Sequence, residues 1–326
     1  MRDSVARARS NVAATPPEGD GGDSRIHVSF RDLWSLQNRG RQLSFLPRQP
    51  SQSVLNGRHR SRIRGRGLDF EELRNYLPGD DIRSIDWKVT ARAGEPHVRV
   101  MTEERDRPTL IIADQRMTMF FGSRLNMKSV TAAQAAALAA FRILDQGDRV
   151  GGIVFGDRHI ADFKPRRSRR VLHRFLMAVA EANGLLSADA PDTEPVSLGS
   201  VLKMVLAMAP RNTLIIVLSD FDNLGEGADL LVSGLARHND LVLCPVTDPI
   251  ADKLPEETRL FVSNGELQAE IDVRDHNTRA RLEEFAQGRL SQVLDWQKRL
   301  GVSVLPLSSA EDTATQMVRL MGVGRR

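Results

Sequence analysis

Two short runs of apolar residues, each ending in an aspartate, constrain the fold of this chain more than any other feature. The runs are 109–114, which ends at Asp114, and 213–220, which ends at Asp220. Each run is continuous rather than alternating, which is typical of a strand that is covered on both faces of a sheet. Helical patterns separate these runs from similar runs further along the chain. The alternation predicts an α/β fold with a mostly parallel central sheet and helices on both faces.

The other elements follow from apolar spacing and turn residues. Residues 26–37 have the apolar spacing of a short helix that docks on the body, and residues 68–76 form a strand or a short helix ahead of a turn at 78–81. Helices are expected at about 127–144, 168–183, 197–208, 226–237, 276–299 and 311–321, and strands at 97–101, 149–155, 160–163, 241–246, 259–262, 267–271 and 302–307.

The basic charge of the chain belongs to its N-terminal segment. Residues 1–66 hold thirteen arginines, no lysine and five acidic residues, a net charge of +8, which leaves −4 for the rest of a chain whose total is +4. Residues 1–25 carry few large apolar side chains and are expected to be a disordered tail. We therefore divide the chain into four regions, which are the tail at 1–25, an arginine-rich arm with a short helix at 26–66, a small β/irregular region at 67–107 and the α/β domain at 108–322.

Several classes of protein are excluded by what the sequence lacks. It contains no run of eighteen apolar residues, so no membrane-spanning helix is expected. Cys244 is the single cysteine, so neither an intramolecular disulfide nor a cysteine-based zinc site is possible, and a reducing cytoplasm is expected. No phosphate-binding loop of P-loop type occurs, and the histidines have no metal-ligand spacing. We expect a protein that is not an enzyme.

A segment at 67–92 carries the strongest motif, in which an aromatic residue precedes Pro-Gly-Asp and is followed by Arg, Asp-Trp and Ala-Arg. In this motif and in the order of the elements after it, the chain resembles the bacterial domain-of-unknown-function family 58, whose members have a von Willebrand factor A fold. Family members tend to occur beside MoxR-type AAA+ ATPases, so the resemblance implies a protein-binding adaptor that partners such an ATPase. The hallmark residues here are Pro78, Gly79, Asp80, Asp81, Arg83, Asp86, Trp87 and Arg92.

The A-type fold is known for a metal-ion-dependent adhesion site built from Asp-x-Ser-x-Ser, a distant Thr and a distant Asp. Asp114, Thr118 and Asp220 match three of these positions as possible ligands of Mg²⁺, but Arg116 replaces the middle serine and Ser197 lies where the threonine is expected. The site is therefore degenerate, and Arg116 itself is an alternative occupant of the metal position. The same five residues are the predicted contact surface for a protein partner.

Two interpretations of the charged segments stay open. The charges of the hallmark motif form either a structural motif anchored by buried Trp87 and Tyr76, which we favour, or a recognition surface. The arginine-rich arm, together with a basic cluster at 164–170 that opens a helix, makes a nucleic-acid-associated protein the alternative function. We rank this alternative lower because no aromatic residues alternate with the arginines for base stacking.

Overall fold

The computed structural model describes residues 23–43, 68–78, 80–103, 108–157, 160–187, 196–209, 211–251, 259–263, 268–272 and 276–321. Residues 1–22 of the expected tail and 44–66 of the arginine-rich arm lie outside these ranges, so what the sequence indicates for them stays a prediction. The division of the chain into four regions also stays a prediction.

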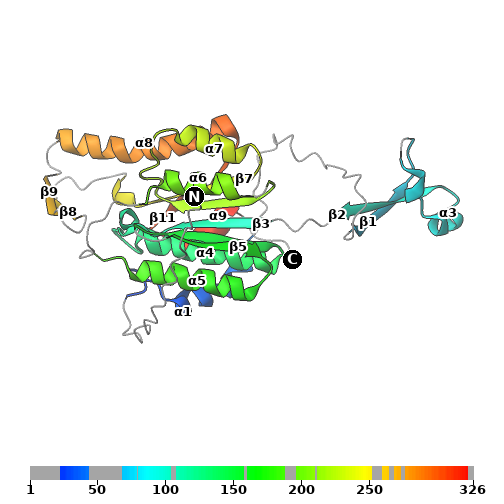
Figure 1. Ribbon diagram of the computed structural model, residues 1–326, viewed down its shortest axis with the longest axis horizontal. Coiled ribbons are helices and arrows are strands. Elements are labelled where there is room, and N and C mark those ends of the chain that lie inside the picture. The colour runs from blue at the N-terminus through cyan, green and yellow to red at the C-terminus, as the bar shows by residue number, and fades with distance from the viewer. Residues whose placement is uncertain are drawn as a thin grey trace, which may run out of the picture.

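A mostly parallel sheet lies at the centre of the α/β body (Figure 1), which confirms the predicted fold class. Its strands run in the order β10-β7-β6-β3-β4-β5, and β11 also pairs with β7. All described pairs in this sheet are parallel except β5, which runs antiparallel to β4. The strands are β3 (Pro108–Asp114), β4 (Arg149–Phe155), β5 (Ile160–Arg166), β6 (Leu214–Ser219), β7 (Asp240–Thr247), β10 (Ser303–Val304) and β11 (Leu307–Ser308).

Helices cover both faces of this sheet, and successive strand residues alternate between the two layers. In β3, Ile111 and Ala113 belong to one hydrophobic cluster, and Leu110 and Ile112 belong to the other. This two-sided burial is the reason that the strands are continuously apolar in sequence. One layer contains α1 (Phe30–Ser35), α4 (Lys128–Asp145), α5 (Arg169–Gly184) and α9 (Thr313–Met321), and the other contains α6 (Leu198–Met208), α7 (Ala228–Ala236) and the C-terminal half of α8 (His276–Leu300).

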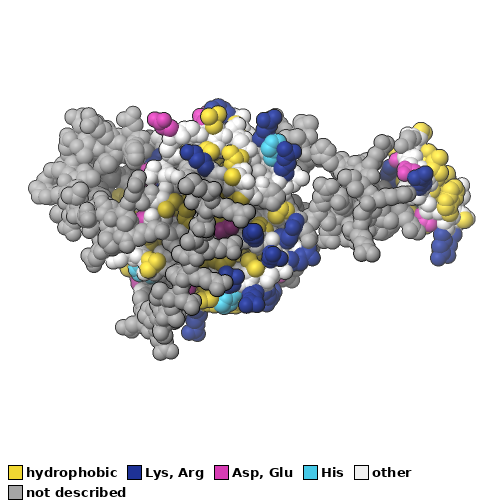
Figure 2. Space-filling view, viewed as in Figure 1, with side chains coloured by type: hydrophobic (Ala, Val, Ile, Leu, Met, Phe, Trp, Pro, Cys, Tyr) yellow, Lys and Arg dark blue, Asp and Glu magenta, His cyan; other side chains and the backbone are white. Residues whose placement is uncertain are grey.

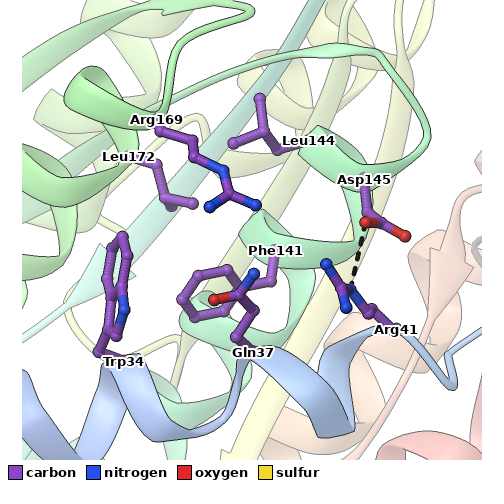
Figure 3. Close-up of a pocket in the computed structure, with 8 residues that line it drawn as sticks. All are labelled: Trp34, Gln37, Arg41, Phe141, Leu144, Asp145, Arg169 and Leu172. Carbon is purple, nitrogen blue, oxygen red and sulfur yellow. Dashed lines mark ion pairs between the residues drawn. The ribbon is translucent and has the colours of Figure 1, made fainter.

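The N-terminal segment docks on the body as the sequence predicts. Helix α1 is followed by the short α2 (Gln37–Gly40), and both pack against α4. Leu33 is fully buried, and the ring of Trp34 meets that of Phe141 edge-on at a centroid distance of 5.4 Å. Asn183 at the end of α5 accepts a hydrogen bond from the N–H of Val28 at 2.7 Å, which fixes the segment ahead of α1. A cavity of about 160 Å³ remains between α2, α4 and α5 (Figure 3).

The hallmark motif lies in a separate β-hairpin, which Figure 1 shows apart from the α/β body. Strand β1 (Leu68–Asn75) pairs antiparallel with β2 (His97–Glu103), and the connection contains the 3₁₀ turn η1 (Ile82–Ser84) and α3 (Trp87–Ala93). The prediction that Trp87 is a buried anchor is wrong, because 67% of this residue is exposed. Trp87 is the first residue of α3, and the main neighbour of this helix among the described elements is β2. Gly79 lies outside the described residues.

The C-terminal elements agree with the sequence except at 302–307. Strands β8 (Arg259–Ser263) and β9 (Gln268–Asp272) form the expected hairpin ahead of α8. The single strand expected at 302–307 is instead two strands, β10 and β11, because Pro306 has no N–H to continue the pairing with β7. Two further 3₁₀ turns are η2 (Met117–Met119) and η3 (Pro249–Ala251). In the described part of the chain, no helix combines the length and apolar character that crossing a bilayer requires.

Candidate functional site

The candidate site lies at the carboxyl ends of β3 and β6, the two neighbouring strands at which the strand order reverses. Asp114 is the last residue of β3, and Asp220 directly follows β6. In open α/β sheets, ligands bind in the crevice outside such a switch point. As the sequence predicted, both aspartates lie at the carboxyl ends of their strands.

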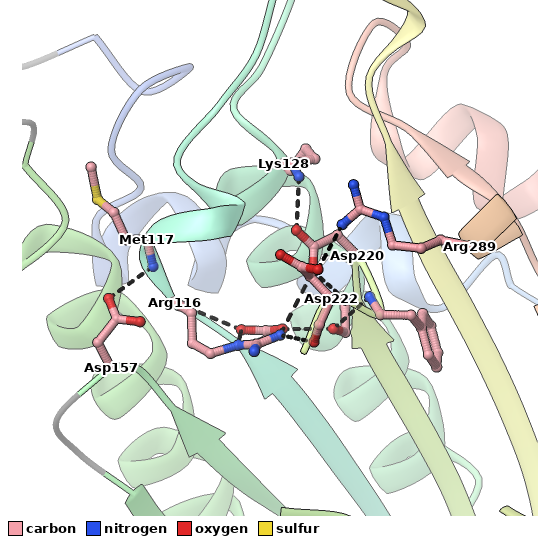
Figure 4. A network of polar contacts seen from close by, with 10 residues as sticks. Arg116, Met117, Lys128, Asp157, Asp220, Asp222 and Arg289 are labelled. Atoms are coloured by element: carbon pink, nitrogen blue, oxygen red, sulfur yellow. Dashed lines mark hydrogen bonds and ion pairs between the residues drawn. The ribbon is translucent and has the colours of Figure 1, made fainter. Parts of the chain in front are cut away.

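The side chain of Arg116 turns back into the protein between the two aspartates (Figure 4). Its Nε donates to Asp114 Oδ1 at 3.0 Å, and its Nη2 donates to Asp114 Oδ2 at 2.6 Å. The same Nη2 lies 3.7 Å from Asp220 Oδ1 and donates to the carbonyl oxygen of Asp222 at 3.1 Å. The guanidinium carbon lies 5.3 Å from the centroid of the Phe155 ring, within the range of a cation–π contact. Arg116 and Asp114 both have 0% exposure.

Each aspartate has further partners within the protein. Asp114 accepts from the hydroxyl of Ser219 at 2.6 Å and from the main-chain N–H of Arg116 at 3.1 Å. Asp220 accepts from Lys128 Nζ at 2.9 Å, and Lys128 is the first residue of α4. Because these bonds involve charged groups and lie in a largely water-free environment, they hold the loops after β3 and β6 in one arrangement.

The surrounding charges keep Arg116 protonated. Burial lowers the pKa of Arg116, but the negative charges of Asp114 and Asp220 outweigh it, and the pKa is raised above its ordinary value. Burial raises the pKa of Asp220, but Lys128 and Arg116 outweigh it, and the pKa is lowered. At Asp114, burial is the largest influence and raises the pKa, and the bonds from Arg116 oppose that shift. Arg116 therefore remains a guanidinium ion at any physiological pH.

These residues do not fit a metal ion. Two carboxylates, Asp114 and Asp220, are already balanced by two cations, Arg116 and Lys128, so Mg²⁺ would add two positive charges beside a buried guanidinium. A hard cation also needs about six oxygen ligands, and both oxygens of Asp114 already accept hydrogen bonds. The hydroxyl of Thr118 is buried and has no hydrogen-bond partner in the described structure, which leaves one oxygen where several are needed.

The predicted contact surface needs a correction. Asp114 and Arg116 cannot touch a partner, because neither is exposed. Their opposite charges pair in the interior, where Nε and Nη2 of Arg116 donate to Asp114, while Nη1 is buried without a hydrogen-bond partner in the described structure. Ser197 stays at the surface, where its hydroxyl caps α6 by accepting from the N–H of Ser200 at 3.1 Å. Of the predicted set, Asp220 lines an accessible groove.

This groove has a volume of about 200 Å³ and lies between the strand ends and α8. Phe121, in the loop after β3, is 44% exposed at this groove. Arg289 of α8 pairs with Asp222 at 3.1 Å, which closes one side of the polar network (Figure 4). The sequence interpretation missed Lys128 and Arg289 because each is far from its partner along the chain. We call this the strand-end groove, and its lining is Phe121, Lys128, Asp220, Phe221, Pro245, Val246, Thr247, Asp248, Arg289, Leu290 and Val293.

Asp248, at the end of β7, has a structural function in this lining. Its carboxylate accepts from the N–H of Ser123 at 2.8 Å and from the N–H of Ile250 at 3.0 Å, and also from the hydroxyls of Ser123 and Ser309. Burial raises the pKa of Asp248, but these hydrogen bonds outweigh it, and the pKa is lowered. One ionised carboxylate thereby joins the loops that follow β3, β7 and β11.

The acidic residues of the hallmark motif hold its turns. Asp80 accepts two hydrogen bonds from the guanidinium of Arg74, both at 2.7 Å, and one from the N–H of Leu77 at 2.9 Å. Asp81 caps η1, and Asp86 caps α3 by accepting from the first N–H groups of that helix. These contacts agree with the structural interpretation for the acids. Pro78 lies in the turn between β1 and η1, while Arg83 and Arg92 project to solvent.

The basic cluster at 164–170 was expected to open a helix, but only its last two residues belong to one. Residues up to Arg166 belong to β5, and α5 begins only at Arg169. Strand β5 is the edge of the sheet, and its Lys164, Pro165 and Arg166 are residues that prevent an edge strand from pairing with another chain. Figure 2 shows basic side chains over this part of the body. The nucleic-acid alternative stays a prediction.

Comparisons with known proteins found relatives that are themselves uncharacterized and one matching family model. The uncharacterized proteins Mb1516 of Mycobacterium bovis and Rv1480 of Mycobacterium tuberculosis are each 28% identical to this chain, over 99% of it and 98% of their own length. Among solved structures, the chain is similar to BatB of Bacteroides thetaiotaomicron, with 13% identity over 65% of this chain and 95% of that chain and a TM-score of 0.37. It is also similar to the SpRpn10 VWA domain, with 11% identity over 68% of this chain and 98% of that chain and a TM-score of 0.35. The profile of the family described as "Protein of unknown function DUF58" matches residues 72–292, more than half of the sequence. This chain belongs to that family.

Proposed function

We propose that this protein is a non-enzymatic binding module of von Willebrand factor A type, which holds a protein partner at the strand-end groove without a metal ion. The observation that carries the proposal is the buried guanidinium of Arg116, which lies between Asp114 and Asp220. In a metal-dependent adhesion site, the cation leaves one position open for a carboxylate of the partner. Here an internal side chain supplies the positive charge, so the partner must be recognised by the groove around it.

A non-catalytic function is supported by the state of the acids. General acid–base catalysis needs a carboxyl group within reach of a substrate. Asp114 is fully buried, and Asp220 is engaged by Lys128. In the described residues, no cluster of three or more His, Cys, Asp or Glu side chains is arranged to hold a metal ion. What remains accessible at the groove is the apolar side chain of Phe121 beside paired charges, a combination that suits protein binding.

For the partner, we propose a MoxR-type AAA+ ATPase in the cytoplasm. Membership of the family supports this choice, because its members tend to occur beside such ATPases. A single, buried cysteine agrees with a reducing compartment. The groove would take a side chain of the ATPase beside Phe121, with Lys128 and Arg289 at its walls.

The test is a binding titration between the full chain and the purified MoxR-type ATPase of the same organism, without nucleotide. We expect Phe121→Ser to weaken binding roughly tenfold or more, the effect of truncating an interface aromatic residue. Leu185→Ser is the matched control, since Leu185 is exposed just after the C-terminal end of α5 and does not line the strand-end groove. The affinity should be the same in Mg²⁺ and in a chelator. Equal binding by Phe121→Ser, or a strict requirement for Mg²⁺, would contradict the proposal.

A further inference from the structure

The tip of the β1–β2 hairpin exposes large apolar side chains that the fold does not use. Leu77, Ile82 and Trp87 are 58%, 64% and 67% exposed, although they lie within eleven residues of one another. Figure 2 shows hydrophobic side chains gathered at this end of the molecule, with basic side chains beside them. Single exposed apolar residues are ordinary, whereas a cluster with a tryptophan marks an interaction site. We call these three residues the tip patch.

The backbone under the tip patch is fixed. Asp80 binds the guanidinium of Arg74 and the N–H of Leu77, so the turn that carries Leu77 is held against β1. Asp81 caps η1, where Ile82 lies. Asp86 caps α3, where Trp87 is the first residue. Each apolar residue therefore stands beside an acid that positions its backbone, and the patch is preorganised for a partner of defined shape.

The tip patch is surrounded by charges of both signs, of which the exposed cations are the more numerous after internal pairing. Arg83, Lys88 and Arg92 are exposed, and none of them has an ion-pair partner in the part of the chain that the structure describes. Asp80 is neutralised by Arg74, and Asp86 is buried under the start of α3. A partner therefore meets three unpaired cations at this surface, together with the exposed carboxylates of Asp81 and Glu95, which in the described structure accept hydrogen bonds only from uncharged groups.

We infer that the tip patch binds an acidic segment of another protein, which places apolar side chains against Trp87 and Ile82 and carboxylates against Arg83, Lys88 and Arg92. Aromatic and arginine side chains are the residues that contribute most to protein interfaces. This surface lies on the hairpin and is distinct from the strand-end groove.

Two other kinds of partner fit less well. An anionic bilayer is fluid, needs no fixed turn and is negative over its whole surface, so it would meet Asp81 and Glu95 as well as the cations. A protein segment of defined shape can place its carboxylates beside the three cations and away from these two acids. Single-stranded nucleic acid is bound by several aromatic side chains in succession, and Trp87 is the one strongly exposed aromatic residue among those described in this hairpin. A peptide carries both the carboxylates and the apolar groups that the surface requires.

The experiment measures fluorescence anisotropy of a labelled amphipathic helical peptide rich in Glu and Leu, titrated with the full chain. We expect binding that weakens as salt increases, and a loss of affinity of roughly 30-fold in Trp87→Ser or Ile82→Ser, as for a central interface residue. Arg83→Glu/Lys88→Glu should weaken binding and remove most of the salt dependence. Leu230→Ser and Arg237→Glu, at exposed positions of α7 and its end, are the matched controls and should bind as the unchanged chain does.

Competing partners are tested in the same way with phosphatidylglycerol vesicles and with a single-stranded RNA. The inference is overturned if the unchanged chain does not bind the peptide, if the tip variants bind it equally well, or if vesicles or RNA bind more tightly through the same residues. Phe121→Ser should leave peptide binding intact, so a failure of the groove proposal and a failure of the tip proposal give different results. Because Trp87 and Ile82 are mostly exposed, their variants should unfold at the same temperature as the unchanged chain.

Discussion

Replacing Arg116 with methionine tests whether the buried guanidinium holds the strand-end loops together. Methionine keeps much of the apolar length of the side chain but removes the charge and all side-chain donors. Asp114 would then be a fully buried carboxylate without its cation, and Asp220 would keep only Lys128. The main-chain N–H of residue 116 and the hydroxyl of Ser219 would still donate to Asp114.

The size of the effect follows from these remaining contacts. Removing one partner of a buried ion pair costs about 3–5 kcal/mol of unfolding free energy. Because Asp114 keeps two hydrogen bonds, we expect a loss near the lower end, about 3 kcal/mol. For a domain of this size, about 2 °C of melting temperature is lost per kcal/mol, so the melting temperature should fall by roughly 6 °C.

The assay is urea unfolding followed by tryptophan fluorescence, with Arg237→Met as a control at an exposed arginine. Asp114→Asn/Arg116→Met should recover about half of the loss, because the amide leaves no uncompensated charge in the interior. The interpretation of Arg116 as a structural cation is refuted if Arg116→Met unfolds within about 1 kcal/mol of the unchanged chain, a change typical of an ordinary site. It is also refuted if the double variant is less stable than Arg116→Met.

Three further predictions concern the scaffold. Gly152→Ala should destabilise the chain by about 1–3 kcal/mol, measured by thermal unfolding, because the added Cβ would lie 2.2 Å from the ring of Phe175. Asn183→Ala should increase hydrogen exchange in residues 23–43, because it removes the amide that binds the backbone of this segment. Arg39 lowers the pKa of Asp312 from its ordinary value to about 2, so the pair should stabilise the fold above pH 4 and lose this effect as the pH falls toward 2. In urea titrations at pH 5 and pH 3, Asp312→Asn should therefore be less stable than the unchanged chain at pH 5 and differ less from it at pH 3.

The main elements of the α/β body could be predicted from the sequence because each depends on a local pattern. The run that ends at Asp114 is apolar on both faces, and the structure buries it on both faces. The loop after it was also interpretable, because Arg116 lies two residues from Asp114 and a guanidinium pairs readily with a neighbouring carboxylate. The contact of Lys128 with Asp220 joins residues 92 positions apart, and no local pattern indicates which distant cation reaches the second aspartate.

Burial was the property that the sequence predicted least well. Trp87 was expected to be buried because tryptophan usually is, but exposure depends on whether another layer lies over the helix that carries it. Asp114 and Arg116 were expected at a contact surface because they lie at the carboxyl end of a central strand. Their charges pair with each other, so both are buried at 0% exposure, although Nη1 of Arg116 has no hydrogen-bond partner in the described structure. In both cases, the tertiary neighbours decided the outcome.

The replacement of a metal ion by a side chain changes what the strand-end groove can recognise. The coordination shell of a bound divalent cation can be completed by a carboxylate of a partner protein, so that partner must supply an acidic residue at one defined point. Nε and Nη2 of Arg116 donate to Asp114 and to the Asp222 carbonyl, the guanidinium lies over the ring of Phe155, and Nη1 is buried, so no nitrogen of this side chain is accessible to a partner. We therefore expect such a site to attract no carboxylate at its centre and to be insensitive to the divalent cation concentration. In the proposed function, specificity comes from the shape and apolar character of the groove beside Phe121, so a truncation there is a sharper test than any change of metal.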